Sequence, residues 1–178
     1  MKFRETELPG AYLIELEPAT DDRGFFARSF CAEEFGEHDL PSAYPQCNVS
    51  FNHTAGTTRG MHWQAPPNAE AKLVRCTAGA IFDVIVDLRS DSPTRLRHVC
   101  VELSAENRHA LFVPEGFAHG FQTLRDASEV FYQMSTPYTP TGARGFRWDD
   151  PDIGIAWPTP PSVISDRDRD LPLLAEIE

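Results

Sequence analysis

The sequence predicts a mainly β protein built as an antiparallel sandwich or barrel. Stretches of alternating apolar and polar residues recur roughly every ten residues, with turn-forming residues between them. Fifteen prolines and eleven glycines interrupt the chain, which suits many short strands better than long helices. No internal repeat or flexible linker is visible, so we expect one domain over residues 1–178.

The clearest strand covers residues 80–89, whose side chains alternate between two faces. Phe82, Val84 and Val86 lie on an apolar face, and Asp83 lies on a mixed one. Alternate side chains of a barrel strand point inward, so polar residues on mixed faces would converge on an interior pocket. Other strands are expected at 98–103, 110–114, 119–124 and 129–134, with helical turns at 31–38 and 171–178.

The formal net charge of −11 argues against a general binder of nucleic acid or of membrane surfaces, because either needs an excess of Lys and Arg. The acidic residues gather at the ends: residues 1–40 carry ten acidic and four basic side chains, and residues 149–178 carry eight and two. Residues 41–148 are nearly neutral and hold five of the six histidines. This middle region is where we expect the pocket.

The four cysteines show no close spacing, so we expect free thiols in a reducing compartment rather than a disulfide or zinc framework. No apolar run at the start suits a signal peptide, and none further on suits a membrane span. We therefore expect a cytoplasmic protein.

The segment 57–64 carries the first side chains suited to proton transfer or anion binding. His62 and Gln64 share one face of the expected strand, and Arg59 stands just before them. Lys72 follows in an apolar strand and is one of only two lysines, against fourteen arginines. Either the protein needs an ammonium group there, or Lys72 is a surface lysine whose stem lies along apolar side chains.

Two later strands add a histidine and a tyrosine. His119 opens the strand after the turn at 114–116, and Tyr132 lies in the strand at 129–134. Each is commonly a structural residue. Two histidines on separate strands of one barrel, with cations nearby, make a functional interpretation of His119 as plausible as a structural one, whereas a tyrosine in a strand is most often part of the core. Tyr138 lies in a proline-bracketed loop, where it either offers an aromatic face to a ligand or is a simple turn residue.

The segment 164–170 alternates acidic and basic residues. It is either a solvated run of charges or a segment that folds back onto the domain. In the second interpretation, a carboxylate such as Asp168 orients a histidine, as acids that support catalytic or ligating histidines do.

Nine sequence blocks, in order between residues 21 and 172, resemble the dTDP-4-dehydrorhamnose 3,5-epimerase family. They include DDRGFFARSF, TTRGMHWQ, VPEGFAHGFQTL, FYQMSTPYTP and ISDRDRDLP. The resemblance covers most of the chain. It implies an all-β, cupin-like jelly roll that acts in deoxysugar biosynthesis and requires no metal or redox cofactor.

The resemblance implies a role for each matching residue. His62 matches the catalytic base, Asp168 the carboxylate paired with it, and Tyr132 the acid. Lys72 matches a lysine near the keto oxygen of the substrate. The residues expected to hold the nucleotide or to line the pocket are Arg23, Gln46, Asn48, Arg59, His119, Tyr138 and Arg167.

The implied substrate is a nucleotide-diphosphate 4-keto-6-deoxyhexose whose C3 and C5 are inverted. The C4 ketone acidifies the hydrogens on both carbons, so His62 can remove one and leave an enolate. Lys72 would stabilise the charge on O4, and Tyr132 would return a proton from the opposite face. The resemblance also implies a homodimer whose amino-terminal segment crosses to the partner's pocket.

Several positions depart from the family's pattern. Arg28 stands where the family has Glu, and Ala143 replaces an acidic residue. Arg167 replaces a Lys, which keeps the charge and changes its shape. Pro137 stands where an aromatic residue is common, and Cys47 where Asp is common. None of them is the expected acid or base, but they bear on nucleotide preference and on whether both carbons are inverted.

Other functions stay open at this point. A metal-dependent cupin would use His62, Gln64 and His119 as ligands, but an amide oxygen is a weak ligand for zinc or iron. A non-catalytic binder of sugar nucleotides would not need a matched acid and base. Within the family, the alternative is an enzyme that inverts C3 only.

Overall fold

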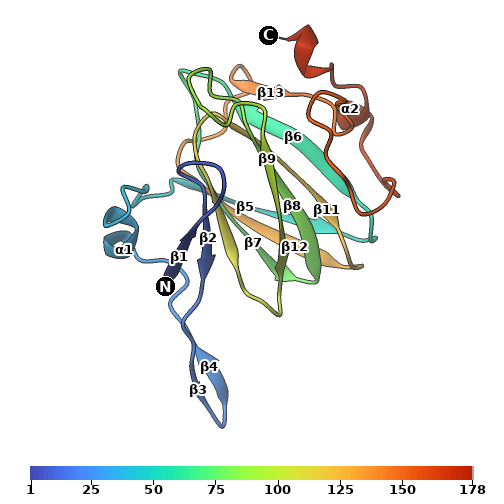
Figure 1. Ribbon diagram of the computed structural model, residues 1–178. Coiled ribbons are helices and arrows are strands. Elements are labelled where there is room, and N and C mark those ends of the chain that lie inside the picture. Colours follow the sequence, from blue (N-terminus) through green and yellow to red (C-terminus); the bar gives the residue numbers. More distant parts are fainter. Residues whose placement is uncertain (178) are drawn as a thin grey trace.

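Two antiparallel sheets face each other in a jelly-roll sandwich (Figure 1). The computed structural model describes residues 1–177. One sheet has the strand order β1-β2-β10-β7-β12-β5 and the other has the order β13-β6-β11-β8-β9. The mainly β architecture predicted from the alternating pattern is confirmed.

The strands are short, as the frequent turn residues predict. The first sheet contains β1 (Lys2–Glu5), β2 (Tyr12–Glu15), β5 (Gln46–Asn52), β7 (Lys72–Ala78), β10 (Ala110–Val113) and β12 (Ser128–Met134). The second contains β6 (Thr58–Gln64), β8 (Ala80–Asp87), β9 (His98–Ser104), β11 (Phe117–Thr123) and β13 (Ala143–Gly145). A separate hairpin is made by β3 (Ala19–Asp21) and β4 (Gly24–Phe26).

Strand β8 shows how the sheets pack, because both of its faces are buried. Ile81 and Ile85, on the mixed face, belong to the main core between the two sheets. Val84 and Val86, on the apolar face, pack with Phe146 beneath the carboxy-terminal segment. The mixed face therefore points into the sandwich, as predicted, and carries Asp83 with it.

Three short helices lie outside the sheets. The predicted helical turns form α1 (Ala32–Gly36), whose Phe35 packs on the first sheet, and the 3-10 helix η1 (Leu174–Glu176). A further helix, α2 (Asp166–Arg169), lies in the segment of alternating charges, where the sequence predicts no helix. Ser165 caps α2, because its Oγ accepts a hydrogen bond from the Asp168 N–H at 3.1 Å.

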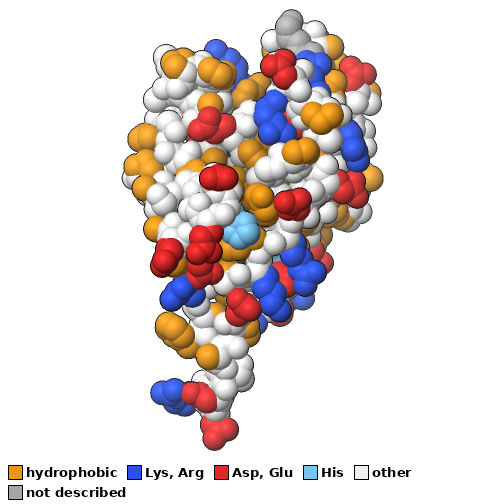
Figure 2. Space-filling model, turned by 60° about the vertical axis from the view of Figure 1, so that its left-hand side comes forward, with side chains coloured by type: hydrophobic (Ala, Val, Ile, Leu, Met, Phe, Trp, Pro, Cys, Tyr) orange, Lys and Arg blue, Asp and Glu red, His pale blue; other side chains and the backbone are white. Residues whose placement is uncertain are grey.

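The β3–β4 hairpin projects from the body of the molecule and carries charged side chains at its tip (Figures 1 and 2). At its base, the Arg108 guanidinium lies over the Phe25 ring, 4.3 Å from its centroid. Among the described residues, no helix is long and apolar enough to cross a membrane. All four cysteines are free thiols.

Candidate active site

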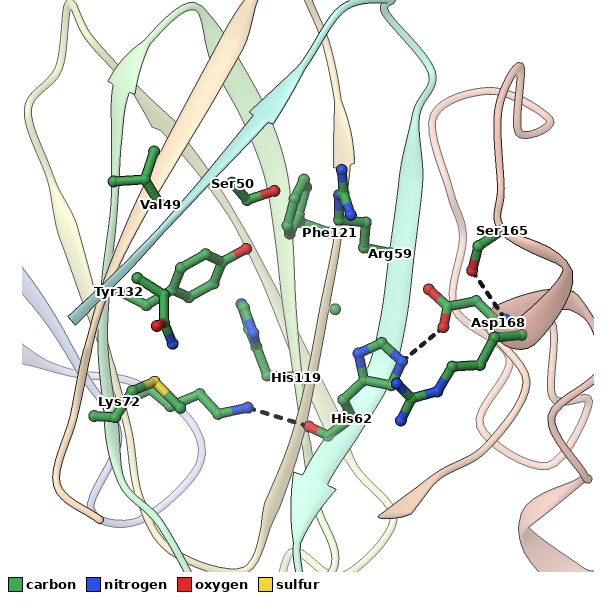
Figure 3. A pocket seen from close by; sticks show the side chains of 14 residues that line it. Val49, Ser50, Arg59, His62, Lys72, His119, Phe121, Tyr132, Ser165 and Asp168 are labelled. Atoms are coloured by element: carbon green, nitrogen blue, oxygen red, sulfur yellow. Dashed lines mark hydrogen bonds and ion pairs between the residues drawn. The ribbon is translucent and has the colours of Figure 1, made fainter. Parts of the chain in front are cut away.

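A cavity of about 380 Å³ opens between the two sheets and reaches the α2 segment (Figure 3). Strands β5, β6, β7, β11 and β12 all contribute side chains to its wall. It brings together eight residues that the sequence predicts for the site: Asn48, Arg59, His62, Lys72, His119, Tyr132, Arg167 and Asp168.

His62 and Asp168 form a hydrogen-bonded pair on one side of the cavity. His62 Nε2 lies 2.8 Å from Asp168 Oδ1, and the Gly60 N–H donates to Asp168 Oδ2 at 3.2 Å. The His62 side chain is 37% exposed and that of Asp168 only 7%. Of the two interpretations of the charged segment, the structure has the one in which it folds back onto the domain. The second ring nitrogen of His62 is left for a ligand.

The Asp168 carboxylate remains ionised near neutral pH. Burial acts to raise the pKa of Asp168, but the hydrogen bond and charge of His62, with the Gly60 N–H, hold it below its usual value. An ionised carboxylate hydrogen-bonded to a histidine holds the ring in one orientation. The other ring nitrogen of His62 is thereby placed to take a proton from a ligand.

An irregularity in β6 places Arg59 and His62 on the same cavity. In a regular strand, residues three apart point to opposite faces. Here His119 of β11 pairs with His62 while Phe121 pairs with Arg59, so β6 carries one extra residue between the pairs. Gly60 lies in this bulge with φ +116°, where a Cβ atom would come within 2.6 Å of the Gly120 Cα.

His119 and Asp83 form a second histidine–carboxylate pair, deep in the wall of the cavity. His119 Nε2 lies 2.7 Å from Asp83 Oδ1, and their side chains are 5% and 0% exposed. The His119 ring meets the Tyr132 ring edge to face, with centroids 6.0 Å apart. The pair thus braces the wall on which Tyr132 stands.

Tyr132 lies across the cavity from His62 (Figure 3). Burial raises the pKa of Tyr132 well above its usual value, and the negative charge of Asp83 raises it further. Arg59 opposes this effect without cancelling it. The hydroxyl is therefore protonated at neutral pH and can act as a proton donor.

Lys72 extends from β7 into the same cavity, although its side chain is only 8% exposed. Its Nζ lies 3.1 Å from Glu70 Oε1 and 3.4 Å from the His62 carbonyl oxygen. Lys72 is thus a buried, paired ammonium and not the surface lysine of the alternative interpretation.

The residues expected to bind the nucleotide lie in different places. Asn48 and Arg59 line the cavity, and Gln46 lies beside Asn48 with its Oε1 accepting the Tyr138 N–H at 3.0 Å. Tyr138 is half exposed in its loop. Arg23 lies at the hairpin tip, 90% exposed and paired with Asp21, and this chain's own cavity does not include it.

Of the five departures from the family pattern, Arg167 lines the cavity, and the other four lie around it and not in its wall. Arg28 is exposed and pairs with Glu34 near α1. The Pro137 carbonyl accepts a hydrogen bond from Gln64, and Ala143 pairs with Gln64 across β6 and β13. Cys47 is exposed on β5.

The three side chains of the metal-cupin alternative do not form a ligand set. Gln64 Oε1 is occupied by the N–H and Oγ1 of Thr139, at 2.7 and 3.1 Å. His62 and His119 each have one ring nitrogen held by a carboxylate. Among the described residues, no group of three His, Cys, Asp or Glu side chains could hold a metal ion.

Two further residues of the site, Asp83 and Glu70, hold His119 and Lys72 in place and are not among the candidates that the sequence predicts. Both left a signal. Asp83 is an acid in the middle of an apolar strand, and Glu70 stands two residues before the isolated lysine. Acids in such positions are rarely buried unless they are paired.

Known proteins similar to this chain show which family it belongs to. The model of the dTDP-4-dehydrorhamnose 3,5-epimerase family matches residues 5–176. A protein of that name from Sinorhizobium fredii is 42% identical over 99% of this chain and 91% of its own. The Bacillus anthracis enzyme of that name, solved with TDP and PPi bound, is 44% identical with a TM-score of 0.93 over 97% of this chain and 99% of its own.

A further similar structure is ChmJ, a 3'-monoepimerase from Streptomyces bikiniensis in complex with dTDP-quinovose. It is 34% identical, with a TM-score of 0.87 over 96% of this chain and 86% of its own. The cupin-like jelly roll expected from the sequence is thereby confirmed. With the family model spanning nearly the whole chain, this protein belongs to the dTDP-4-dehydrorhamnose 3,5-epimerase family.

Proposed function

We propose that this protein is an isomerase that inverts C3 and C5 of dTDP-4-dehydro-6-deoxy-D-glucose, giving dTDP-4-dehydro-L-rhamnose. The observation that carries the proposal is the His62–Asp168 pair facing the protonated Tyr132 across one cavity. A base on one side and an acid on the other are what inversion of a carbon centre requires.

The base side begins the reaction. The free ring nitrogen of His62 takes the proton from C3 or C5, and the electrons of that C–H bond move to O4 of the C4 ketone. The charge that develops on O4 lies near the Lys72 ammonium, which stabilises the enolate by a preorganised electrostatic contact. Asp168 stabilises the imidazolium formed at His62.

The acid side completes the inversion. Tyr132 donates its hydroxyl proton to the same carbon from the opposite face, and the electrons on O4 return to re-form the ketone. His62 then carries one extra proton and Tyr132 lacks one, so exchange with solvent restores both groups before the second carbon reacts. The raised pKa of Tyr132 favours its reprotonation.

The nucleotide and diphosphate lie, in this proposal, between the cavity and the loop at 137–139. Arg59 and Arg167 supply the positive charge for the diphosphate, and Tyr138 offers its half-exposed ring to the base. The Bacillus anthracis relative binds TDP, which is consistent with a thymidine nucleotide here.

We also infer a cytoplasmic homodimer of one-domain chains. The projecting hairpin supports the dimer, because it exposes Phe26 and carries Arg23 away from its own cavity, where only another chain could use it. Light scattering after gel filtration tests the dimer; a monomer at micromolar concentration would contradict it. The four free thiols agree with a reducing compartment.

Inversion at C3 alone is the second candidate, because the chain is also similar to a 3'-monoepimerase. The two functions differ in what exchanges with solvent. In deuterated water, a 3,5-epimerase incorporates deuterium at both carbons and a 3-epimerase at C3 only.

The test of the proposed function is NMR of dTDP-4-dehydro-6-deoxy-D-glucose incubated with the enzyme in deuterated water. We expect uptake at C3 and C5, and none with His62→Ala. Tyr132→Phe should still exchange hydrogen on the face of His62 without inverting the carbon. Tyr44→Phe is the matched control, because that buried hydroxyl has no hydrogen-bond partner among residues 1–177 and lies outside the cavity. No uptake by the unaltered enzyme would refute the proposal.

A further inference from the structure

A buried chain of polar groups runs from Lys72 to the loop that carries Tyr138. Lys72 Nζ lies 3.1 Å from Glu70 Oε1, and Gln64 Nε2 donates to Glu70 Oε2 at 2.8 Å. At the far end, Gln64 Oε1 accepts the Thr139 N–H at 2.7 Å. All three side chains at 64, 70 and 72 are buried. Neither Glu70 nor Gln64 is among the described residues that line the cavity, so they act from behind its wall.

Glu70 determines where the Lys72 ammonium points. An ammonium group has three N–H donors. The Glu70 carboxylate takes one, and the His62 carbonyl oxygen, at 3.4 Å, lies along a second. With these two directions fixed, the tetrahedral geometry of the nitrogen fixes the third donor. That donor is the one left for a ligand in the cavity.

Gln64 holds the loop together with Gln46, whose Oε1 accepts the Tyr138 N–H. Gln64 Nε2 donates to Glu70 and to the Pro137 carbonyl at 3.3 Å, while Gln64 Oε1 accepts from the N–H and Oγ1 of Thr139. An amide has one donor side and one acceptor side, so the carboxylate at position 70 also fixes which way this amide faces. The loop is thereby held on both sides of Tyr138.

We propose that Glu70 and Gln64 are positioning residues that couple the nucleotide end of the site to its sugar end. This inference rests on the proposed function, in which Tyr138 meets the base and Lys72 meets O4. A ligand that orders the loop at 137–139 fixes the orientation of the Gln64 amide. The amide in turn fixes the Glu70 carboxylate, and the carboxylate fixes the direction of the free Lys72 N–H. A substitution at Gln64 or at Glu70 should therefore weaken both the binding of the nucleotide and the positioning of the Lys72 ammonium.

The carboxylate at position 70 is essential to the coupling because it supplies two acceptors to two donors. The substitution Glu70→Gln keeps the shape but leaves one acceptor oxygen for Lys72 and Gln64 to share. Either the ammonium loses its partner, or the Gln64 amide turns and releases Thr139. Gln64→Glu instead sets two carboxylates against each other where Gln64 Nε2 now donates to Glu70.

Exchanging the two side chains restores the pattern. In the double variant Gln64→Glu/Glu70→Gln, the amide at 70 accepts from Lys72 and donates to the carboxylate at 64. That carboxylate still accepts from Thr139. The contact of Nε2 with the Pro137 carbonyl, the longest of the Gln64 hydrogen bonds, is lost. The negative charge that pairs with the Lys72 ammonium is kept in the chain of polar groups but moves from position 70 to position 64.

The experiment measures kcat with dTDP-4-dehydro-6-deoxy-D-glucose and the dissociation constant of dTDP for both single variants and the double variant. We expect each single variant to lose about ten- to a hundredfold in kcat, because the Lys72 donor is misdirected. We expect dTDP to bind about three- to tenfold more weakly, the effect of one lost hydrogen bond. The double variant should recover both quantities to within about threefold of the unaltered enzyme.

Arg144→Ala is the matched control, since Arg144 Nη1 binds the exposed carbonyls of Thr141 and Ala143, in the segment that joins the loop to β13, and does not contact Glu70. It should leave kcat unchanged. A fall in kcat without weaker dTDP binding in Glu70→Gln overturns the coupling, and so does a folded double variant that recovers neither quantity.

Thr139→Val decides the question if the double variant does not fold. It removes only the hydroxyl that Gln64 Oε1 accepts. The coupling predicts lower kcat as well as weaker dTDP binding, and weaker binding alone overturns it. An unaltered enzyme with no epimerase activity would refute the proposed function, whereas an active enzyme indifferent to these substitutions refutes only the coupling.

Discussion

The cavity contains two histidine–carboxylate pairs with nearly the same geometry and very different surroundings. His62 and Asp168 lie 2.8 Å apart, and His119 and Asp83 lie 2.7 Å apart. The His62 side chain is 37% exposed, but that of His119 is 5% exposed. A short hydrogen bond to a carboxylate therefore does not identify a base; access to the ligand distinguishes the two pairs.

The pairs also differ in how the chain builds them. Asp83 lies on β8 and His119 on the neighbouring β11, so the second pair forms as soon as these two strands pair. Asp168 comes from α2, at the far end of the chain, and reaches His62 only when the carboxy-terminal segment docks on the sandwich. The His62–Asp168 contact can consequently be broken by a substitution in the carboxy-terminal segment while the two sheets stay folded.

The largest expected difference is between the two histidines. His62→Gln should lower kcat about a thousandfold, because the general base is lost. His119→Gln should lower it by at most about tenfold, since only a hydrogen bond in the cavity wall changes. Steady-state rates of deuterium uptake measure both. Equal losses would show that exposure does not distinguish the pairs.

Substitution of the two carboxylates should also lower kcat more in the His62–Asp168 pair than in the His119–Asp83 pair, but by a smaller factor than substitution of the histidines. Asp168→Asn should lower kcat about ten- to a hundredfold, the usual cost of removing an acid that supports a functional histidine. Asp83→Asn should act mainly on stability, because Asp83 is fully buried and its Oδ2 has no hydrogen-bond partner in the described part of the chain. Chemical denaturation followed by circular dichroism separates the two effects. A greater loss of kcat in Asp83→Asn would reverse the assignment of the two pairs.

Much of this arrangement could be predicted from the sequence, because it follows from side-chain periodicity. Alternation in residues 80–89 predicts a strand with its mixed face inward, and β8 has Ile81, Asp83 and Ile85 on that face. The contact of Asp168 with His62 is one of the two interpretations that the charged segment at 164–170 allows. It could be stated because a carboxylate is the usual partner of a functional histidine.

The rest could not be predicted, since it depends on irregular backbone and on distant contacts. Regular alternation would place Arg59 and His62 on opposite faces, and only the bulge at Gly60 brings both to the cavity. The helix α2 has only four residues, so it is too short to show a helical pattern of apolar residues, and a serine such as Ser165 before it is not by itself evidence of a helix. Glu70 contacts Lys72 directly and also accepts a hydrogen bond from Gln64, which lies on the separate strand β6, so this three-residue contact is not visible in the local sequence.

The dependence of stability on pH offers a third comparison. The pKa of Asp168 is lower in the folded protein than its ordinary value of 3.8, so the folded state binds this proton less tightly than the unfolded chain does. The contribution of Asp168 to the free energy of unfolding is therefore complete above pH 3.8. It is lost as the pH falls through the lower pKa of the folded state.

We expect the free energy of unfolding of the unaltered protein to fall toward that of Asp168→Asn as the pH is lowered below 3.8. Urea titrations at several acidic pH values measure the difference between the two proteins. A difference that stays constant through this range would mean that Asp168 carries no shifted pKa, and that its charge does not depend on His62.

The smallest expected effect concerns the cap of α2. Ser165→Ala removes the hydroxyl that accepts the Asp168 N–H, which should cost about 1 kcal/mol of stability. Because Ser165 also lines the cavity beside Asp168, we expect kcat to fall by a few-fold at most. Ser165→Asp, which can also cap the helix, should restore stability. It also adds a negative charge near the proposed diphosphate site, so it should raise the KM. If neither substitution altered activity, the carboxy-terminal segment would hold Asp168 through the His62 and Gly60 contacts alone.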